Sequence, residues 1–220
     1  MTPDSEVLVI GCGTSKQPLE LAGDLGCKII ATDCSGAVVT AMAARHRHAS
    51  VSWEVADCME LLYASNRFAA VVDKGTLDAV QLRDEVRSTN KCQSCSLTLG
   101  RVSVQGARTA KLLAEAARVL KPGGVLLVAS LHGDCLSPEA TRAEMEEYGV
   151  PEVEWPPWPS EWDEVEQALE MFEPVHMEEV QCEKSGELLY AYRLKKKGKA
   201  ARTRKQYHAY RGGGATTRRR

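Results

Sequence analysis

The segment VVDKGTLDAV places charged side chains directly after a run of apolar residues. Residues 68–72 are apolar enough to form a buried strand, and Asp73, Lys74 and Gly75 follow in immediate succession. A loop at this point needs only turn-forming residues. Adjacent opposite charges, followed by a second acid at Asp78, therefore indicate a site rather than a connector.

A glycine-rich segment, GCGTSK, follows the first apolar run of the chain. Gly11 and Gly13 let a ligand approach the backbone closely, because a Cβ at either position would collide with it. Twenty residues after Gly13, Asp33 ends a second apolar run. At that distance an acid accepts hydrogen bonds from ribose hydroxyls in a nucleotide-binding βαβ unit. The alternative for Asp33 is an acid at the N-terminus of the next helix, near Ser35.

The ligand that this pattern favours carries a ribose but no pyrophosphate. A dinucleotide fingerprint needs a third glycine where this chain has Lys16. Asp57 follows a third expected strand, at 51–55, and can accept a hydrogen bond from the exocyclic amine of adenine, while the backbone amide of Cys58 faces a ring nitrogen. Matched groups at three strand ends therefore favour S-adenosylmethionine over NAD.

Alternating strand and helix patterns must position these residues. Strands are expected at 7–10, 27–32, 51–55, 68–72 and 125–131, and helices near 14–26, 37–47 and 107–120. Near the end, VHMEEVQC and ELLYAYRL flank a Lys-Ser-Gly turn and predict an antiparallel hairpin. The pattern predicts an α/β fold: a Rossmann-like, doubly wound, mostly parallel seven-stranded sheet with a C-terminal antiparallel hairpin. Ligands of such sheets bind outside the carboxyl ends of the strands.

Composition predicts one domain in a cytoplasmic protein. A chain of 220 residues with 44% hydrophobic content can bury one substantial core. No apolar run approaches the roughly 20 residues of a membrane span, so we expect no membrane contact. Eight scattered cysteines suit reduced thiols better than a disulfide framework.

Charge divides the chain near residue 194. Residues 195–220 contain 11 Lys and Arg and no Asp or Glu, whereas residues 1–194 contain 17 basic and 30 acidic residues. We expect a folded domain over 1–194 and a basic tail over 195–220. Disorder and weak contact with nucleic acid, the ribosome or the nuclear-import machinery are the alternatives for the tail.

Two cysteine-containing segments raise the alternative of a zinc site. Cys92 and Cys95 have the spacing of half a zinc site, and His132 with Cys135 could supply the other half. CxxC pairs also arise by chance in a chain with eight cysteines, so we predict no metal.

The segments VLVIGCGTS, IIATDCS, VADCMEL, FAAVVDKGTLDAV and ARVLKPGG, in this order, resemble the seven-β-strand (class I) S-adenosylmethionine-dependent methyltransferases. DKGTLDA is similar to the group that contains the elongation factor 1-alpha lysine methyltransferases and the citrate synthase lysine methyltransferase. Members of this group carry a longer segment before the first strand, including an aromatic-rich lid helix. Only MTPDSE stands there in this sequence, so we expect the lid to be missing. The resemblance implies S-adenosylmethionine contacts at Gly11, Cys12, Gly13, Asp33, Cys34, Asp57, Cys58 and Asp73.

The resemblance also implies that residues 73–78 line the transfer site. Methyl transfer is an in-line displacement, which requires a neutral nucleophile about 3–3.5 Å from the methyl carbon. A lysine amine, with a pKa of about 10.4 in water, arrives protonated. We assign Asp73 and Asp78 to orienting this ammonium or the methionine part of the cofactor. Lys74 is either a catalytic residue or the ion-pair partner of one of these acids.

The predicted function is methyl transfer from S-adenosylmethionine to a protein amine, most directly a lysine of a translation elongation factor or a metabolic enzyme. One alternative is a small-molecule methyltransferase with the same fold. Another is a catalytically silent protein that binds RNA through residues 195–220.

Overall fold

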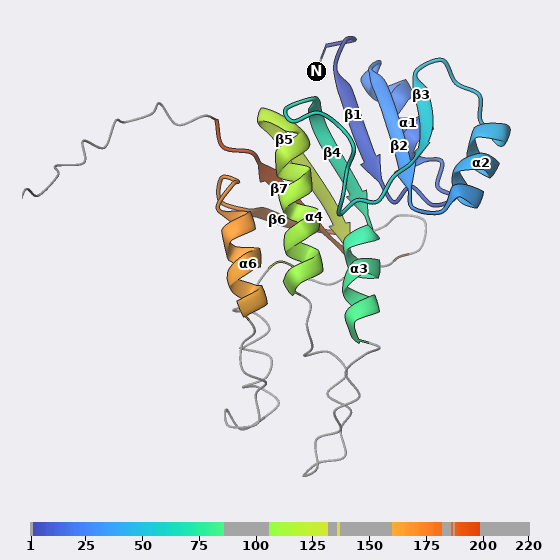
Figure 1. Ribbon diagram of the computed structural model, residues 1–220. Helices are drawn as coiled ribbons and strands as arrows, with labels where there is room; N and C mark the ends of the chain where they lie inside the picture. The colour runs from blue at the N-terminus through green and yellow to red at the C-terminus, as the bar shows by residue number, and fades with distance from the viewer. Residues whose placement is uncertain are drawn as a thin grey trace, which may run out of the picture.

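The computed structural model describes residues 2–85, 106–131, 136, 160–181, 186 and 188–198. The strands are β1 Glu6–Ile10, β2 Lys28–Asp33, β3 Val51–Val55, β4 Phe68–Lys74, β5 Leu120–Ser130, β6 His176–Gln181 and β7 Leu188–Lys195. The helices are α1 Gln17–Leu25, α2 Gly36–Arg45, α3 Thr76–Glu85, α4 Gly106–Val119 and α6 Ser160–Leu169. The strands form one seven-stranded sheet in the order β3-β2-β1-β4-β5-β7-β6 (Figure 1).

The direction of the strands confirms the predicted fold. β1 to β5 pair in parallel, and β7 pairs antiparallel with both β5 and β6. The strand order reverses at β1, which has β2 on one side and β4 on the other. In an open α/β sheet this switch point is where a crevice opens beyond the carboxyl ends of the strands.

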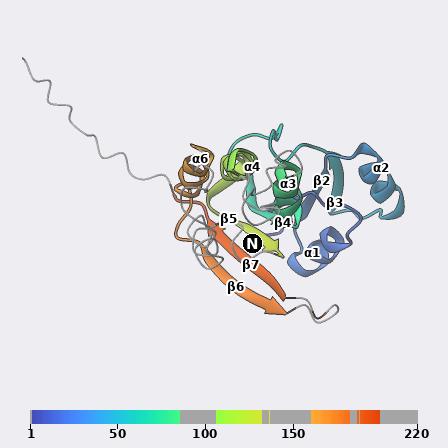
Figure 2. The same ribbon diagram turned by 90° about the horizontal axis from the view of Figure 1, so that it is seen from below.

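Alternating residues of the strands supply two cores, one on each face of the sheet. Leu8 and Ile10 of β1 belong to the cluster that includes the apolar residues of α4, whereas Val7 and Val9 belong to the cluster packed with Leu19 and Ala22 of α1. Figures 1 and 2 show α3, α4 and α6 on one face of the sheet and α1 on the other. Burial on both faces explains why the central strands β1 and β4 are largely continuous apolar runs.

Several boundaries differ from those expected from the sequence, and three of the differences have a clear structural reason. α1 begins at Gln17 rather than near residue 14, because the preceding residues form a turn in which Ser15 N–H donates to the Cys12 carbonyl. β4 continues past residue 72, since Asp73 pairs with both Ile10 and Val128. β5 begins at Leu120, before the Lys-Pro-Gly-Gly segment, which bulges out of the ladder.

The C-terminal hairpin extends the sheet slightly beyond the expected domain limit at residue 194. β7 ends at Lys195, and the Lys196 N–H donates to the Gly124 carbonyl at 2.8 Å. The Lys197 N–H donates to the Met171 carbonyl at 3.0 Å. Main-chain hydrogen bonds thus tie residues 195–197 to the sheet. None of the helices in the described part of the chain has the length and apolar character needed to cross a membrane.

Candidate active site

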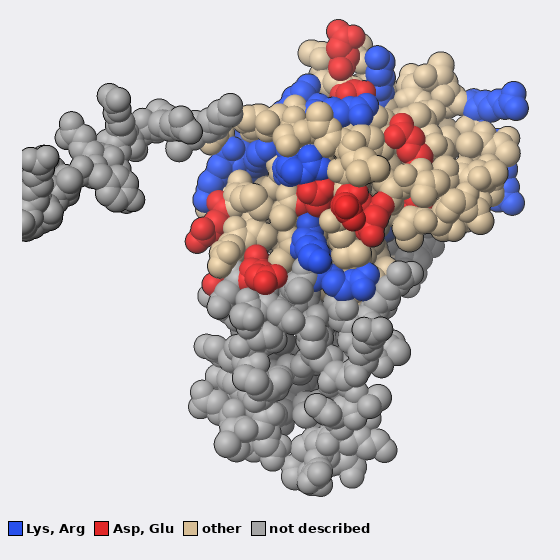
Figure 3. Space-filling view, in the orientation of Figure 1, with Lys and Arg blue, Asp and Glu red and all other residues tan. Residues whose placement is uncertain are grey.

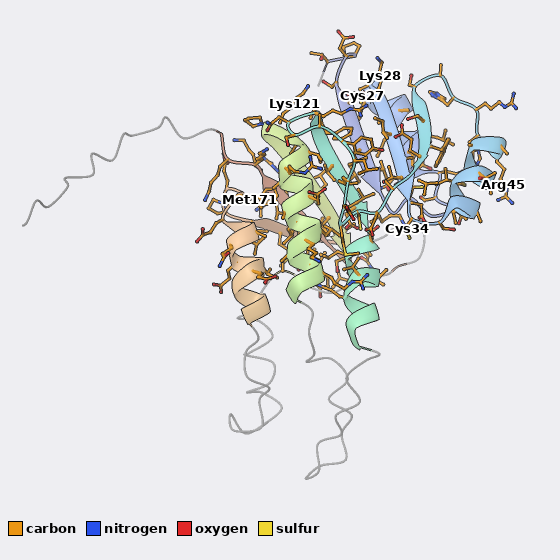
Figure 4. All side chains as sticks on the ribbon, in the orientation of Figure 1. Cys27, Lys28, Cys34, Arg45, Lys121 and Met171 are labelled. Atoms are coloured by element: carbon orange, nitrogen blue, oxygen red, sulfur yellow. The ribbon has the colours of Figure 1, made fainter. Side chains whose placement is uncertain are left out.

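The predicted site residues meet at one edge of the sheet. Because β1 to β4 are parallel, the segments that follow them all emerge on the same side. Figure 4 shows the direction on β2, with Cys27 and Lys28 at its start and Cys34 at its other end. The residues gathered at this carboxyl edge are Gly11, Cys12, Gly13, Asp33, Cys34, Asp57, Cys58, Asp73, Lys74 and Asp78.

The two glycines after β1 have different surroundings. Both have left-handed backbones, with φ +57° at Gly11 and +51° at Gly13. A Cβ on Gly11 would lie 2.0 Å from Thr76 Oγ1, whereas a Cβ on Gly13 would meet nothing within 4 Å. Gly11 therefore makes room for a neighbouring residue of the protein, contrary to the expectation that a ligand demands it. Gly13 leaves open space beside the backbone.

Asp33 joins the glycine-rich segment to the end of β2. Its Oδ2 accepts a hydrogen bond from Gly13 N–H at 3.0 Å, and its Oδ1 accepts one from Ser35 N–H at 2.9 Å. An ionised carboxylate has about four acceptor positions, so about two remain for a ligand. The side chain is partly exposed and can use them. Asp33 thus both orders the loop and offers acceptors beside the open space at Gly13.

Asp73 is buried, with 1% of its surface exposed. Its two oxygens accept hydrogen bonds from Thr76 N–H at 2.8 Å and Leu77 N–H at 3.0 Å, which satisfies donors at the start of α3. Burial raises the pKa of Asp73 to about 7, against the opposing effect of these two donors. Asp78 raises this pKa further and Lys74, whose side chain is exposed, lowers it.

Asp78 connects α3 to the end of β5. Its Oδ1 accepts a hydrogen bond from Ser130 Oγ at 2.5 Å, and its Oδ2 accepts one from Leu131 N–H at 3.1 Å. Asp78 is itself buried. The structure therefore brings Asp73 and Asp78 to the same corner of the sheet, with both carboxylates engaged by the protein.

The residues after β3 form a tight turn. Asp57 is exposed, and its Oδ1 accepts a hydrogen bond from Met59 N–H at 2.9 Å. Cys58 is half-buried against the larger core. Burial, followed by the charges of Asp57 and Asp73, raises the pKa of the Cys58 thiol to about 12. This thiol is protonated at neutral pH and is a poor nucleophile.

The other cysteines at this edge differ in exposure. Burial, with a smaller contribution from Asp33, raises the pKa of Cys12 to about 11, whereas Cys34 is exposed. Among the described residues, no group of three or more His, Cys, Asp and Glu side chains is arranged to hold a metal ion. The four residues considered for zinc, Cys92, Cys95, His132 and Cys135, lie outside the described residues.

Thr76 fell within the predicted range 73–78 without a role of its own, and Ser130 was not singled out from the sequence. Thr76 fills the space beside Gly11 and donates its hydroxyl to the Ile10 carbonyl at 3.0 Å. Ser130 contacts Asp78. A hydroxyl residue that ends the apolar run VLLVAS was a usable signal for Ser130. No local pattern indicated Thr76, because its partner is 66 positions away.

Comparison with known proteins finds one family over most of the described sheet. A family model described as "Methyltransferase domain" matches residues 8–128. EEF1A lysine methyltransferase 4 of Mus musculus is 36% identical over 126 residues, which cover 56% of this chain and 45% of that protein. The eEF1A lysine and N-terminal methyltransferase of Mus musculus is 36% identical over 132 residues, covering 59% of this chain and 16% of that protein. The chain thus spans less than half the length of these relatives.

Solved structures share the fold at low sequence identity. A SAM-dependent methyltransferase from Methanosarcina mazei superimposes with a TM-score of 0.53 at 18% identity, covering 90% of this chain and 95% of that one. The N-methyltransferase NodS from Bradyrhizobium japonicum gives a TM-score of 0.51 at 17% identity, covering 88% and 86%. These similarities establish a common fold and nothing finer.

Proposed function

This chain belongs to the class I S-adenosylmethionine-dependent methyltransferases, and we propose that its methyl acceptor is a protein amine, most directly a lysine side chain. S-adenosylmethionine is the methyl donor of this family. The observation that carries the lysine assignment is the 36% identity to EEF1A lysine methyltransferase 4. Since less than half of that protein is covered, its substrate serves here as a guide to the chemical class.

The carboxyl edge has the groups that a nucleoside with a short charged chain requires. Asp33 has acceptor positions left for two ribose hydroxyls, and the space beside Gly13 admits a ligand against the backbone. Asp57 is exposed beyond β3, where a carboxylate can accept the adenine amine. These features support the prediction that Gly13, Asp33 and Asp57 contact the cofactor. The bound cofactor supplies an electrophilic methyl group on a sulfonium.

Asp73 and Asp78 support the proposed transfer through position and charge. Both lie at the junction between the end of β4 and the start of α3, beside the end of β1. Their hydrogen bonds to Thr76, Leu77, Ser130 and Leu131 hold this corner rigid. We propose that the ionised forms of these carboxyl groups favour an approaching ammonium, and that the charge of Lys74, which lowers the pKa of Asp73, balances part of theirs. A cytoplasmic location stays a prediction.

A labelling experiment tests the acceptor class. The full chain is incubated with methyl-labelled S-adenosylmethionine and a cell extract, which is then separated into protein, nucleic acid and small molecules. Label in a protein that yields methyl-lysine on acid hydrolysis supports the proposal. Label confined to small molecules would replace it with the small-molecule alternative, and label in RNA would also contradict it.

A further inference from the structure

The strand β6 lies at the edge of the sheet. It is the last strand in the sheet order, and among the described residues it pairs with β7 alone. All six of its residues are exposed. Figure 2 shows β6 at the margin of the sheet, beyond β7. Alternate N–H and C=O groups of such an edge strand point away from its neighbour and can pair with another chain.

This edge is acidic. Residues 160–181 contain eight Asp and Glu and no Lys or Arg. Glu178 and Glu179 stand in the middle of β6, opposite the uncharged Ala191 and Tyr190 of β7. Glu178 Oε1 lies 2.8 Å from His176 Nε2 on the same strand, and the Glu179 side chain has no hydrogen-bond or ion-pair partner among the described residues. Exposed acids also lie on α6, which precedes β6 in the chain and packs against α4. Figure 3 shows acidic side chains at the left of the coloured surface. A strand added here would meet negative charge on both faces of the sheet, since Glu178 and Glu179 point to opposite sides.

The same charges disfavour pairing with a second copy of this chain. Antiparallel pairing of two HMEEVQ strands about their centre places Glu178 opposite Glu179 of the other copy. Like charges directly opposite each other destabilise a strand pair. A basic strand would instead meet opposite charges at these positions.

Apolar side chains accompany the two glutamates. Met177 and Val180 are each 42% exposed. Their partners on β7 are Tyr192 and Leu189, so they lie on opposite faces of the sheet. An added strand can therefore bury one apolar contact on each face, beside the main-chain hydrogen bonds.

We propose that β6 binds an extended, basic segment of the methyl-accepting protein as an eighth strand of the sheet. The inference rests on the proposed function, because it assigns the docked segment to the substrate. In this mode of binding, main-chain hydrogen bonds between the strands supply the affinity, and side chains supply the specificity for the sequence of the bound segment. Glu178 and Glu179 select basic residues, and Met177 and Val180 accept apolar ones.

The position of β6 also sets where the methylated lysine lies. β6 is parallel to β4, so its end at Gln181 lies on the same edge as the candidate active site. An added strand lies four strand spacings from β4, about 19 Å. An extended chain covers this distance in roughly six residues. The target lysine should therefore stand about six residues or more from the docked segment.

A binding experiment that needs no methyl transfer tests the docking surface. The probe is a fluorescent peptide of about eight residues with alternating Lys and Val, measured by anisotropy against the full chain. The double substitution Glu178→Lys and Glu179→Lys should weaken binding at least about tenfold. Matched substitutions of the exposed Glu164 and Glu166 on α6 make the same charge change without altering a strand edge, and should weaken it much less.

Two further measurements separate strand pairing from simple charge attraction. The same peptide with N-methylated amides keeps its charge but loses its donors, and it should not bind. Amides of β6 should exchange more slowly with the unmodified peptide bound. Equal weakening by the two double variants, equal binding of the N-methylated peptide, or no binding at all would overturn the proposal. If the unsubstituted chain transferred no methyl group to any protein, the proposed function would be contradicted instead, whatever the peptide measurements gave.

Discussion

The side chain of Thr76 fills the space that a side chain on Gly11 would need, where the end of β1 meets the start of α3. A Cβ on Gly11 would lie 2.0 Å from Thr76 Oγ1 and 2.8 Å from its Cγ2. The Thr76 hydroxyl donates to the Ile10 carbonyl, the residue just before this glycine. The glycine-rich segment and the DKGT segment are therefore two halves of one packing contact.

Replacing the two glycines of GCG should separate the packing contact with Thr76 from the strain of a left-handed backbone. Gly11→Ala should cost about 1–2 kcal/mol for its left-handed backbone and about 1–3 kcal/mol more for the overlap with Thr76. Gly13→Ala should cost only the backbone strain, because the added methyl group meets open space. Denaturant unfolding measures both losses. Equal destabilisation by the two substitutions would contradict the contact with Thr76.

Asp33 should control affinity for the cofactor. Asp33→Ala should weaken binding of S-adenosylhomocysteine by about 1–3 kcal/mol, the effect of losing hydrogen bonds to a charged acceptor. Part of the loss should come from the loop, because Gly13 N–H loses its acceptor. Calorimetric titration of both proteins measures the difference, with NADH as the control ligand. Tight NADH binding without a response to S-adenosylhomocysteine would refute the assigned cofactor site.

Asp73 should matter more for the reaction than for the cofactor. Asp73→Asn preserves shape and removes the negative charge that would favour an ammonium, so the single-turnover rate should fall by a factor of about 10 or more. S-adenosylhomocysteine affinity should stay nearly constant. Asp78→Asn should lower the rate less, because this residue lies on α3 rather than on β4.

The same preparations reveal a purely structural role for Asp73. Its carboxylate caps the start of α3, so Asp73→Asn can also lower the melting temperature. If the substitution lowers only the melting temperature and leaves turnover per folded molecule intact, Asp73 is a capping residue without a part in the reaction.

Burial of Asp73 also predicts a pH dependence of stability. Its pKa is raised from 3.8 to about 7 in the folded protein, so the folded state binds a proton that the unfolded state has released. This contribution to stability is complete below about pH 4 and is lost as the pH rises toward 7. The free energy of unfolding of the wild type should therefore decrease relative to Asp73→Asn from pH 4 to pH 8. A constant difference would contradict the raised pKa.

Two C-terminal deletions should behave differently. Removal of residues 199–220 should leave cofactor affinity and the melting temperature unchanged, because the described hydrogen bonds of the hairpin end before residue 199. Removal from residue 195 onward should lower the melting temperature, since it also removes the main-chain hydrogen bonds that Lys196 makes with Gly123 and Gly124. Thermal unfolding compares the two. If residues 195–220 bind nucleic acid, salt-sensitive RNA binding should disappear with the longer deletion.

Most of the sheet could be predicted from the sequence, because its central strands are buried on both faces and are therefore largely apolar. The runs ending at Ile10, Asp33 and Val55 lie close to β1, β2 and β3. The hairpin of β6 and β7 was predictable from its turn residues and its two flanking β-patterns. The spacing of Gly13 and Asp33 also indicated a contact, and the two residues share a hydrogen bond.

Only the tertiary structure decided what each polar group at the carboxyl edge contacts. Gly11 excludes a side chain because of Thr76, and Asp78 bonds Ser130, which is 52 positions away. Asp73 is almost fully buried and satisfies donors at the start of α3, which its place beside Lys74 did not indicate. Local patterns report which residues prefer burial, a turn or a helix. The partner of a buried hydrogen-bonding group depends instead on which strand ends the sheet order brings together.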